Sequence, residues 1–100
     1  MNINDFMNSQ IPAINEIIKN LDTNFSSHHF IEKFSKKFES YYIDMLVKYQ
    51  NVGGAFMKVH AQIAKFLSEN MESFDIEKDE KKLSENIFGN EDIIQWWSKI

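Results

Sequence analysis

The chain has 100 residues, which is enough for one domain with a modest hydrophobic core and too short for two. Hydrophobic residues make up 43% and aromatic residues 14%, so the chain has ample material for a packed interior and is not expected to be disordered. It contains no cysteine, which excludes disulfides, thiolate metal sites and cysteine nucleophiles. We therefore predict a single helical domain over residues 1–100 that non-covalent contacts hold together.

The net charge of −4 is unevenly distributed along the chain. Residues 28–68 contain six lysines and three acidic residues, whereas residues 69–92 contain nine acidic residues and three lysines. All eleven basic residues are lysine, so arginine, the side chain best suited to bidentate recognition of phosphate or guanine, is absent. The molecule is therefore expected to be electrically asymmetric.

No segment of the sequence has the pattern of a targeting signal or a membrane span. The first ten residues contain no basic residue, and nowhere do 18 apolar residues follow one another. We therefore expect a soluble, cytoplasmic protein with no membrane contact.

Proline and glycine divide the first half of the chain into helical segments. Ser9 is expected to cap a first helix that tolerates Pro12 in its first turn and ends near residues 22–24. Its apolar residues recur at intervals of three and four, which is the spacing of one buried helical face. These residues are Ile11, Ile14, Ile17, Ile18 and Leu21.

A second helix of about six turns is expected over residues 28–50, capped by Ser26 or Ser27. Ile43 and Val47 fall opposite its apolar stripe, so either the first helix covers them or they mark a partner or dimer interface. The stripe itself consists of Phe30, Ile31, Phe34, Phe38, Tyr41, Tyr42, Met45, Leu46 and Tyr49.

Residues 53–70 predict a third helix that follows two glycines. His60 falls inside its apolar arc, and we expect this histidine at the edge of the core, hydrogen-bonded to a backbone group or a tyrosine hydroxyl. A role as general base is the less favoured interpretation, because it needs a partner and a cleft. The opposite side of the helix carries Lys58, Gln62 and Lys65.

The helical period ends at about residue 71. Alternation in "FDIEK" indicates a short β-hairpin within residues 74–88, with a loop as the alternative. Asn90 is then expected to cap a last helix in which Trp97 enters the core and Trp96 stays at the margin, where it could anchor a contact. The predicted fold class is mainly α: a bundle of about four helices, with this hairpin before the last one.

The sequence lacks the patterns of catalytic and metal sites. His28 and His29 have no HxxxH or HxxE spacing, and we expect both to be solvated at a helix start. GxGxxG, GxxxxGK and GxSxG motifs are absent as well. We therefore predict a protein that is not an enzyme, uses no cofactor or metal and has no small-molecule substrate.

Binding functions remain, and we favour a protein-interaction module: a small acidic inhibitor, immunity or regulatory protein. Its carboxylates could occupy a partner's nucleic-acid-binding surface in the places where phosphates would lie. The partner is a second protein or a second copy of the chain. The predicted partner-binding residues are Trp96, Ile43, Val47, Glu77, Asp79 and Glu80.

The alternative function is nucleic-acid binding. Over residues 28–90, the order of helices followed by a hairpin is similar to that of winged-helix DNA-binding domains. This resemblance implies that Lys58, Gln62 and Lys65 face the DNA groove, glutamine being a side chain that pairs with adenine. The acidic segment would then form the wing and repel phosphate, which makes this interpretation the second choice.

Overall fold

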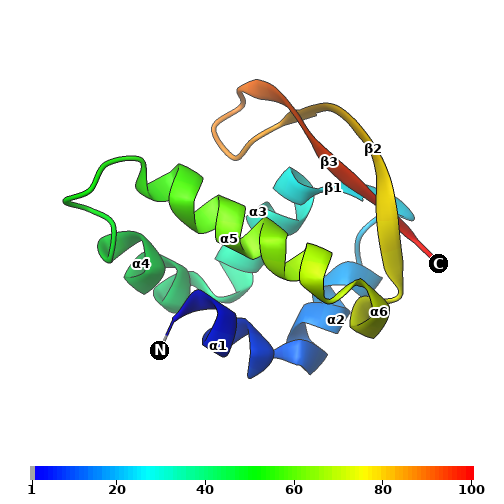
Figure 1. Cartoon of the computed structure of the whole chain (residues 1–100), viewed down its shortest axis with the longest axis horizontal. Helices are drawn as coiled ribbons and strands as arrows, with labels where there is room; N and C mark the ends of the chain where they lie inside the picture. Colours follow the sequence, from blue (N-terminus) through cyan, green and yellow to red (C-terminus); the bar gives the residue numbers. More distant parts are fainter. Residues whose placement is uncertain (1) are drawn as a thin grey trace.

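The structure is a computed structural model that describes residues 2–100, and it shows an α+β fold (Figure 1). Within these residues the helices are α1 (Ile3–Asn8), α2 (Ile11–Lys19), α3 (Ser27–Lys37), α4 (Glu39–Val47), α5 (Ala55–Glu69) and α6 (Met71–Phe74). The strands are β1 (Asn24–Ser26), β2 (Ile76–Glu85) and β3 (Glu91–Lys99), which form one antiparallel sheet in the order β1-β3-β2. The predicted mainly α bundle is therefore wrong.

The largest correction concerns the C-terminal segment, which is strand β3 and not a helix. β3 is the central strand of the sheet, with Phe25 opposite Trp97 on one side and Leu83 opposite Ile93 on the other. Isoleucine and tryptophan are favoured in strands, and their spacing here also fits a helical face. Pairing with the neighbouring strand β2 and with the distant strand β1 decides between the two, and Asn90 caps no helix.

A hairpin is present, but its predicted position is wrong: residues 74–88 were expected to hold both strands, whereas residues 76–85 form a single strand and the second strand begins at residue 91. β2 is its first strand, residues 86–90 form the turn, and β3 is its second strand. The side-chain oxygen of Asn86 accepts hydrogen bonds from the backbone N–H groups of Phe88 (2.9 Å) and Asn90 (3.1 Å). Gly89 has φ +80°, a conformation that glycine adopts without strain. This turn presents Phe88 at the hairpin tip.

The predicted second helix is two helices, α3 and α4, separated at Phe38, which has φ −115° and ψ 44°. Ser26 caps α3; it is one of the two residues, Ser26 and Ser27, that were predicted as the cap. Its hydroxyl accepts a hydrogen bond from the N–H of His29 at 3.1 Å, and the Ser26 N–H donates to His29 Nδ1 at 3.2 Å.

The predicted first helix is α2, but Ser9 does not cap it: Ser9 ends the additional helix α1.

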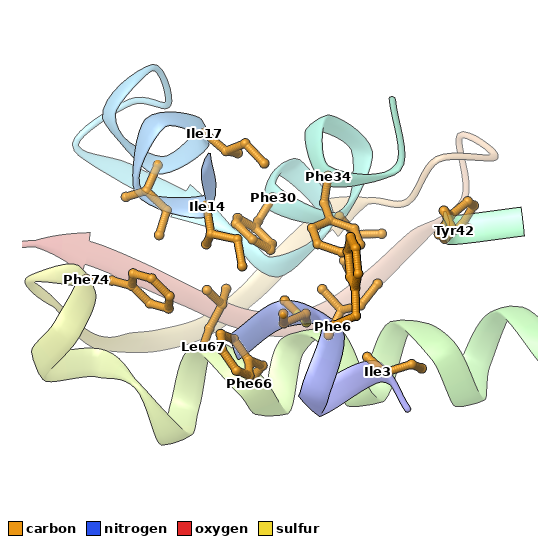
Figure 2. Packing of buried hydrophobic residues seen from close by; sticks show 14 of the residues in the cluster. Ile3, Phe6, Ile14, Ile17, Phe30, Phe34, Tyr42, Phe66, Leu67 and Phe74 are labelled. Carbon is orange, nitrogen blue, oxygen red and sulfur yellow. The ribbon is translucent and has the colours of Figure 1, made fainter. Parts of the chain in front are cut away.

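The hydrophobic core lies between the helices and the sheet (Figure 2). Phe6 of α1 joins three elements there, with ring centroids 6.4 Å from Phe34, 5.3 Å from Phe38 and 4.4 Å from Tyr41. Such ring pairs add about 0.5–1.5 kcal/mol beyond their buried area. Helix α1, which lies before the first predicted helix, therefore joins α3 to α4.

Ile43 and Val47 are not covered by the first helix. Their side chains, on one face of α4, are 49% and 50% exposed. The interpretation in which α2 buries them is wrong, and their role as a partner or dimer interface stays a prediction.

Candidate interaction surface

A cleft of about 440 Å³ lies between the tip of the β2–β3 hairpin, helix α5 and the beginning of α3. Figure 1 shows the hairpin curving over these two helices. Most of the lining is apolar, and its larger members are Ile31, Phe56, Met57, Phe88 and Ile94. The polar lining consists of His28, His60, Asn86 and Asp92. Three segments that are far apart in the sequence thus build one concave surface.

Two aromatic side chains face each other at the mouth of this cleft. The ring of Phe56 at the start of α5 lies 4.8 Å from the ring of Phe88 at the hairpin tip, edge to face at 81°. Gly53 and Gly54, with φ +83° and +65°, make the turn that leads into α5. Phe56, Phe88 and the neighbouring Met57 are nevertheless 44%, 56% and 77% exposed. Large exposed apolar side chains gathered at one cleft are typical of a binding surface.

Three carboxylates lie next to the hairpin turn: Asp92 lines the cleft, whereas Glu85 and Glu91 line a separate hollow with His29 and Trp96. Glu85 lies opposite Glu91 and Ser84 lies opposite Asp92 in the hairpin register. The ion pairs among residues 2–100 are Lys36–Glu32 and Lys82–Asp79, so none involves Glu85, Glu91 or Asp92. Like charges directly opposite each other on paired strands are destabilising. We call these three residues the acidic cluster; it gives the hairpin tip a local negative charge.

His28 at the base of the cleft is buried, which corrects the expectation of a solvated side chain. It is 8% exposed, and its Nδ1 is the one buried side-chain nitrogen or oxygen in the described part of the chain that has no hydrogen-bond partner. Burial lowers the pKa of His28 below the ordinary 6.5, although the backbone carbonyls of Ser84 and Glu85 and the charge of Asp92 act in the opposite direction. The net effect of these surroundings favours the neutral imidazole of His28.

His60 also lines the cleft, and its expected bond to a tyrosine hydroxyl is confirmed. The Tyr42 hydroxyl and His60 Nε2 are hydrogen-bonded at 2.6 Å, and the two rings stack with centroids 5.8 Å apart. Burial lowers the pKa of His60, and the nearby His28 lowers it further; burial also raises the pKa of Tyr42. His60 is thus both a residue of the core edge and part of the cleft wall.

These two histidines predict that acid destabilises the fold. Because the folded-state pKa values of His28 and His60 lie below 6.5, the unfolded chain binds more protons as the pH falls. The free energy of unfolding should therefore be constant above about pH 7.5 and decrease as the pH falls through the unfolded-state pKa of 6.5, by about 1.4 kcal/mol for each tenfold loss of proton affinity. Urea titrations at several pH values would measure this. The double variant His28→Gln/His60→Gln should lose the slope, and an unchanged slope would contradict the assignment.

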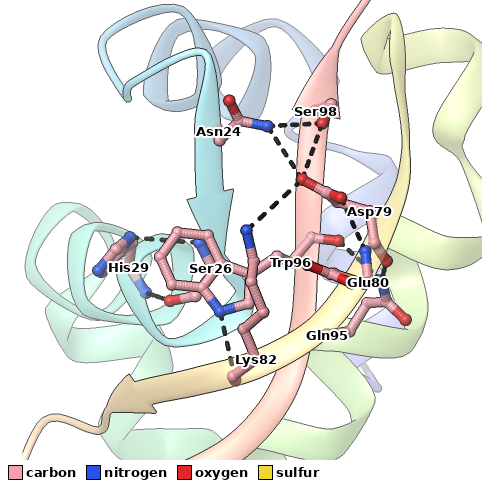
Figure 3. A network of polar contacts seen from close by, with 9 residues as sticks. All are labelled: Asn24, Ser26, His29, Asp79, Glu80, Lys82, Gln95, Trp96 and Ser98. Atoms are coloured by element: carbon pink, nitrogen blue, oxygen red, sulfur yellow. Dashed lines mark hydrogen bonds and ion pairs between the residues drawn. The ribbon is translucent and has the colours of Figure 1, made fainter.

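The structure places Trp96 on β3 rather than on a helix, and its indole is held within the fold (Figure 3). The indole Nε1 donates to the backbone carbonyl of Lys82 at 3.3 Å, and Lys82 Nζ lies 4.7 Å from the ring centroid. The ring of His29 packs edge-on at 5.3 Å. Trp96 is partly exposed beside these contacts, so its role as a partner anchor stays a prediction.

Asp79 belongs to a polar network that ties the hairpin to β1 (Figure 3). Its carboxylate accepts hydrogen bonds from Asn24 at 3.0 Å, from Ser98 at 3.2 Å and from the backbone N–H of Glu80 at 2.8 Å. The Glu80 N–H is the main reason why the pKa of Asp79 is lowered. Glu77 and Glu80 are exposed. The three acids predicted to bind a partner thus lie at the base of the hairpin, away from its tip, and Asp79 has a structural role.

The three residues of the nucleic-acid alternative lie on α5. Lys58 and Lys65 are exposed, and Lys58 Nζ donates to the backbone carbonyl of Gly53 at 3.1 Å. The Gln62 amide donates to the Tyr49 hydroxyl at 2.7 Å and to the Lys58 carbonyl at 3.3 Å. A glutamine that pairs with adenine must donate one of its two amide N–H groups to the base, so Gln62 would have to give up at least one of these contacts.

Two features that would suggest other functions are missing from residues 2–100. No group of three or more histidine, aspartate or glutamate side chains is placed to hold a metal ion. None of the helices in that range is long and apolar enough to cross a membrane.

Comparison with known proteins does not assign the chain to a family. It matches no family model, no curated protein and no solved structure.

Proposed function

We propose that this chain is a protein-interaction module and that it binds its partner at the cleft between α5 and the hairpin. The observation that carries the proposal is the exposure of Phe56, Met57 and Phe88 at the mouth of a preformed cleft. Aromatic and methionine side chains are enriched in the cores of protein interfaces. Because a regular helix and a hydrogen-bonded turn hold these side chains, the partner would find them already in place.

The acidic cluster indicates the charge of the partner. Glu85 and Glu91 repel each other in the isolated protein, and a lysine or arginine of the partner would relieve that repulsion. Opposite charges also steer two proteins toward each other and select against acidic partners. The partner surface is therefore an apolar segment flanked by basic residues.

One observation favours nucleic-acid binding as a second candidate. Helix α5 followed by the β2–β3 hairpin has the order that the resemblance to winged-helix domains implies, and Lys58 and Lys65 of α5 are exposed. The charge of the hairpin tip opposes it, because Glu85, Glu91 and Asp92 would lie where a wing meets phosphates. Protein binding is the function that this charge supports better.

Charge reversal at the hairpin separates the two functions. In the double variant Glu85→Lys/Glu91→Lys the two facing side chains still repel each other, so the folded state keeps the same kind of unfavourable pair while its charge changes sign. The immobilised wild-type protein should retain a partner from lysate of the source cells after nuclease treatment, and the double variant should lose it. Mass spectrometry would identify the retained protein.

A matched variant, Lys58→Ala/Lys65→Ala, should retain the same protein partner. Nucleic-acid binding predicts the reverse pattern: retention abolished by nuclease, weakened by loss of the two lysines and strengthened by the charge reversal. That pattern would overturn the proposed function.

A further inference from the structure

A second hollow of the molecule, a groove of about 360 Å³, lies between helix α2 and helix α3. It shares no lining residue with the cleft. Its apolar lining includes Ile17 and Leu21, and Glu16 is the one acidic residue of the lining. The α3 side carries three lysines, which are Lys33, Lys36 and Lys37. The groove is therefore an apolar surface flanked by basic residues, which is the kind of surface that the proposed partner presents.

Like charges on α3 are left uncompensated at this groove. Lys36 Nζ lies 3.2 Å from a carboxylate oxygen of Glu32, but the ion pairs among residues 2–100 include neither Lys33 nor Lys37. Both of these side chains are exposed, and they are four residues apart on one helix, a spacing at which like charges repel. Carboxylates brought to the groove would relieve this repulsion, just as lysines would relieve the repulsion within the acidic cluster.

The hairpin tip has the complementary charge and an apolar anchor. Residues 85–92 contain three acidic residues and no lysine. Phe88 is 56% exposed at the tip, and aromatic side chains often dominate the binding energy of interfaces. Figure 1 shows the hairpin tip in the upper part of the view and α2 in the lower part, so a tip does not reach the groove of its own chain. A tip that fills the groove must come from another molecule.

We propose that the partner is a second copy of this chain, and that Phe88 at the hairpin tip of one copy enters the α2–α3 groove of the other. The inference rests on the proposed function and names its partner. The acidic cluster of one copy then meets the lysines of the other, and both repulsions between like charges are relieved. Because the two surfaces differ, the contact is head-to-tail, and each added copy leaves one tip and one groove open until a ring closes.

Sedimentation equilibrium of the pure protein gives the first test. The average mass should rise with concentration above the 11.8 kDa of one chain. Salt raised from about 0.1 M to about 1 M should weaken the association, because the screening length falls from about 10 Å to about 3 Å. A mass of 11.8 kDa at all concentrations up to about 1 mM would overturn the inference. If a different protein is then captured through Glu85 and Glu91, the proposed function still stands.

A charge swap gives the second test. The variants Glu85→Lys/Glu91→Lys and Lys33→Glu/Lys37→Glu should each self-associate at least about tenfold more weakly, because like charges meet in the contact. Their equimolar mixture should regain wild-type association. In the mixture the reversed tip faces the reversed groove, and the unaltered tip faces the unaltered groove. Restored association also demonstrates that both variants are folded.

The control variant Lys65→Glu/Lys78→Glu carries the same change of charge at exposed lysines outside the groove, and it should associate as the wild type does. Wild-type association by either charge-reversed variant alone would overturn the inference. So would a mixture that stays monomeric although circular dichroism shows both variants to be folded. The wild-type measurement decides the question where a variant does not fold.

Discussion

Replacing Trp97 with alanine should lower the free energy of unfolding by about 3–5 kcal/mol. The side chain is 1% exposed and lies in the central strand opposite Phe25. Its indole Nε1 donates to the Ser27 hydroxyl at 3.0 Å, and that hydroxyl donates to the Gln95 carbonyl at 3.0 Å. The change therefore opens a cavity and removes one of these two hydrogen bonds between β3 and the start of α3. Since small domains have about 5–15 kcal/mol of stability in total, this loss would be a large fraction of it.

The neighbouring tryptophan is the matched control for this change. Trp96→Ala should cost only about 1 kcal/mol, because the partly exposed ring mainly loses its contact with Lys82, and cation–π contacts at exposed sites contribute about 0.5–1 kcal/mol. Urea denaturation of the two variants measures the difference. Where the slope of the unfolding free energy against urea concentration is the same, the shift of the midpoint reports the loss of stability. Equal losses at the two positions would contradict the burial that separates them.

The burial of Trp97 and the partial exposure of Trp96 were predictable from sequence, although the predicted helix was wrong. On a helix, adjacent residues cannot both point fully inward; on a strand, they point to opposite faces. The predicted helix and the observed strand would therefore each bury one tryptophan of the pair and leave the other at the margin. Helix α5 was predictable for a firmer reason, because a glycine pair precedes it and its apolar residues keep one spacing over four turns.

The sheet could not be predicted, because the signal for it does not lie within any one segment. β1 has three residues, two of them the polar Asn24 and Ser26, and it exists through pairing with β3, 70 to 74 positions later. Sequence periodicity reports on local structure alone, so it could not decide between a helix and a strand for residues 91–99.

The cleft was beyond sequence reasoning for the same reason. Its walls come from the start of α3, from α5 and from the hairpin, so no single segment carries its pattern. His28 is buried only because the hairpin covers it, and the pKa of its imidazole responds to Ser84, Glu85 and Asp92 of that hairpin. One signal was present: Phe56, Met57 and Phe88 flank glycine-containing turns, where large apolar side chains are unexpected unless they bind something.

Removing the apolar side chains at the mouth of the cleft should weaken partner binding at least tenfold while the fold stays intact. In Met57→Ala/Phe88→Ala both altered side chains are more than half exposed, so the urea midpoint should change little. In the complex the same side chains would be buried, and central apolar residues of an interface contribute about 2 kcal/mol or more each when they dominate binding. Calorimetric titration of the captured partner measures the dissociation constant of each variant.

The control is a variant with a similar loss of exposed apolar side chain on a different element. Ile43→Ala/Val47→Ala removes two half-exposed side chains of α4, which the sequence alone predicted to be an interface. If the partner binds at the cleft, this variant should keep wild-type affinity. If Ile43 and Val47 prove necessary for partner binding and Met57 and Phe88 do not, α4 is the interface and the cleft is not. Because the two variants share a fold and differ in the surface they alter, their affinities assign the partner to one side of the molecule.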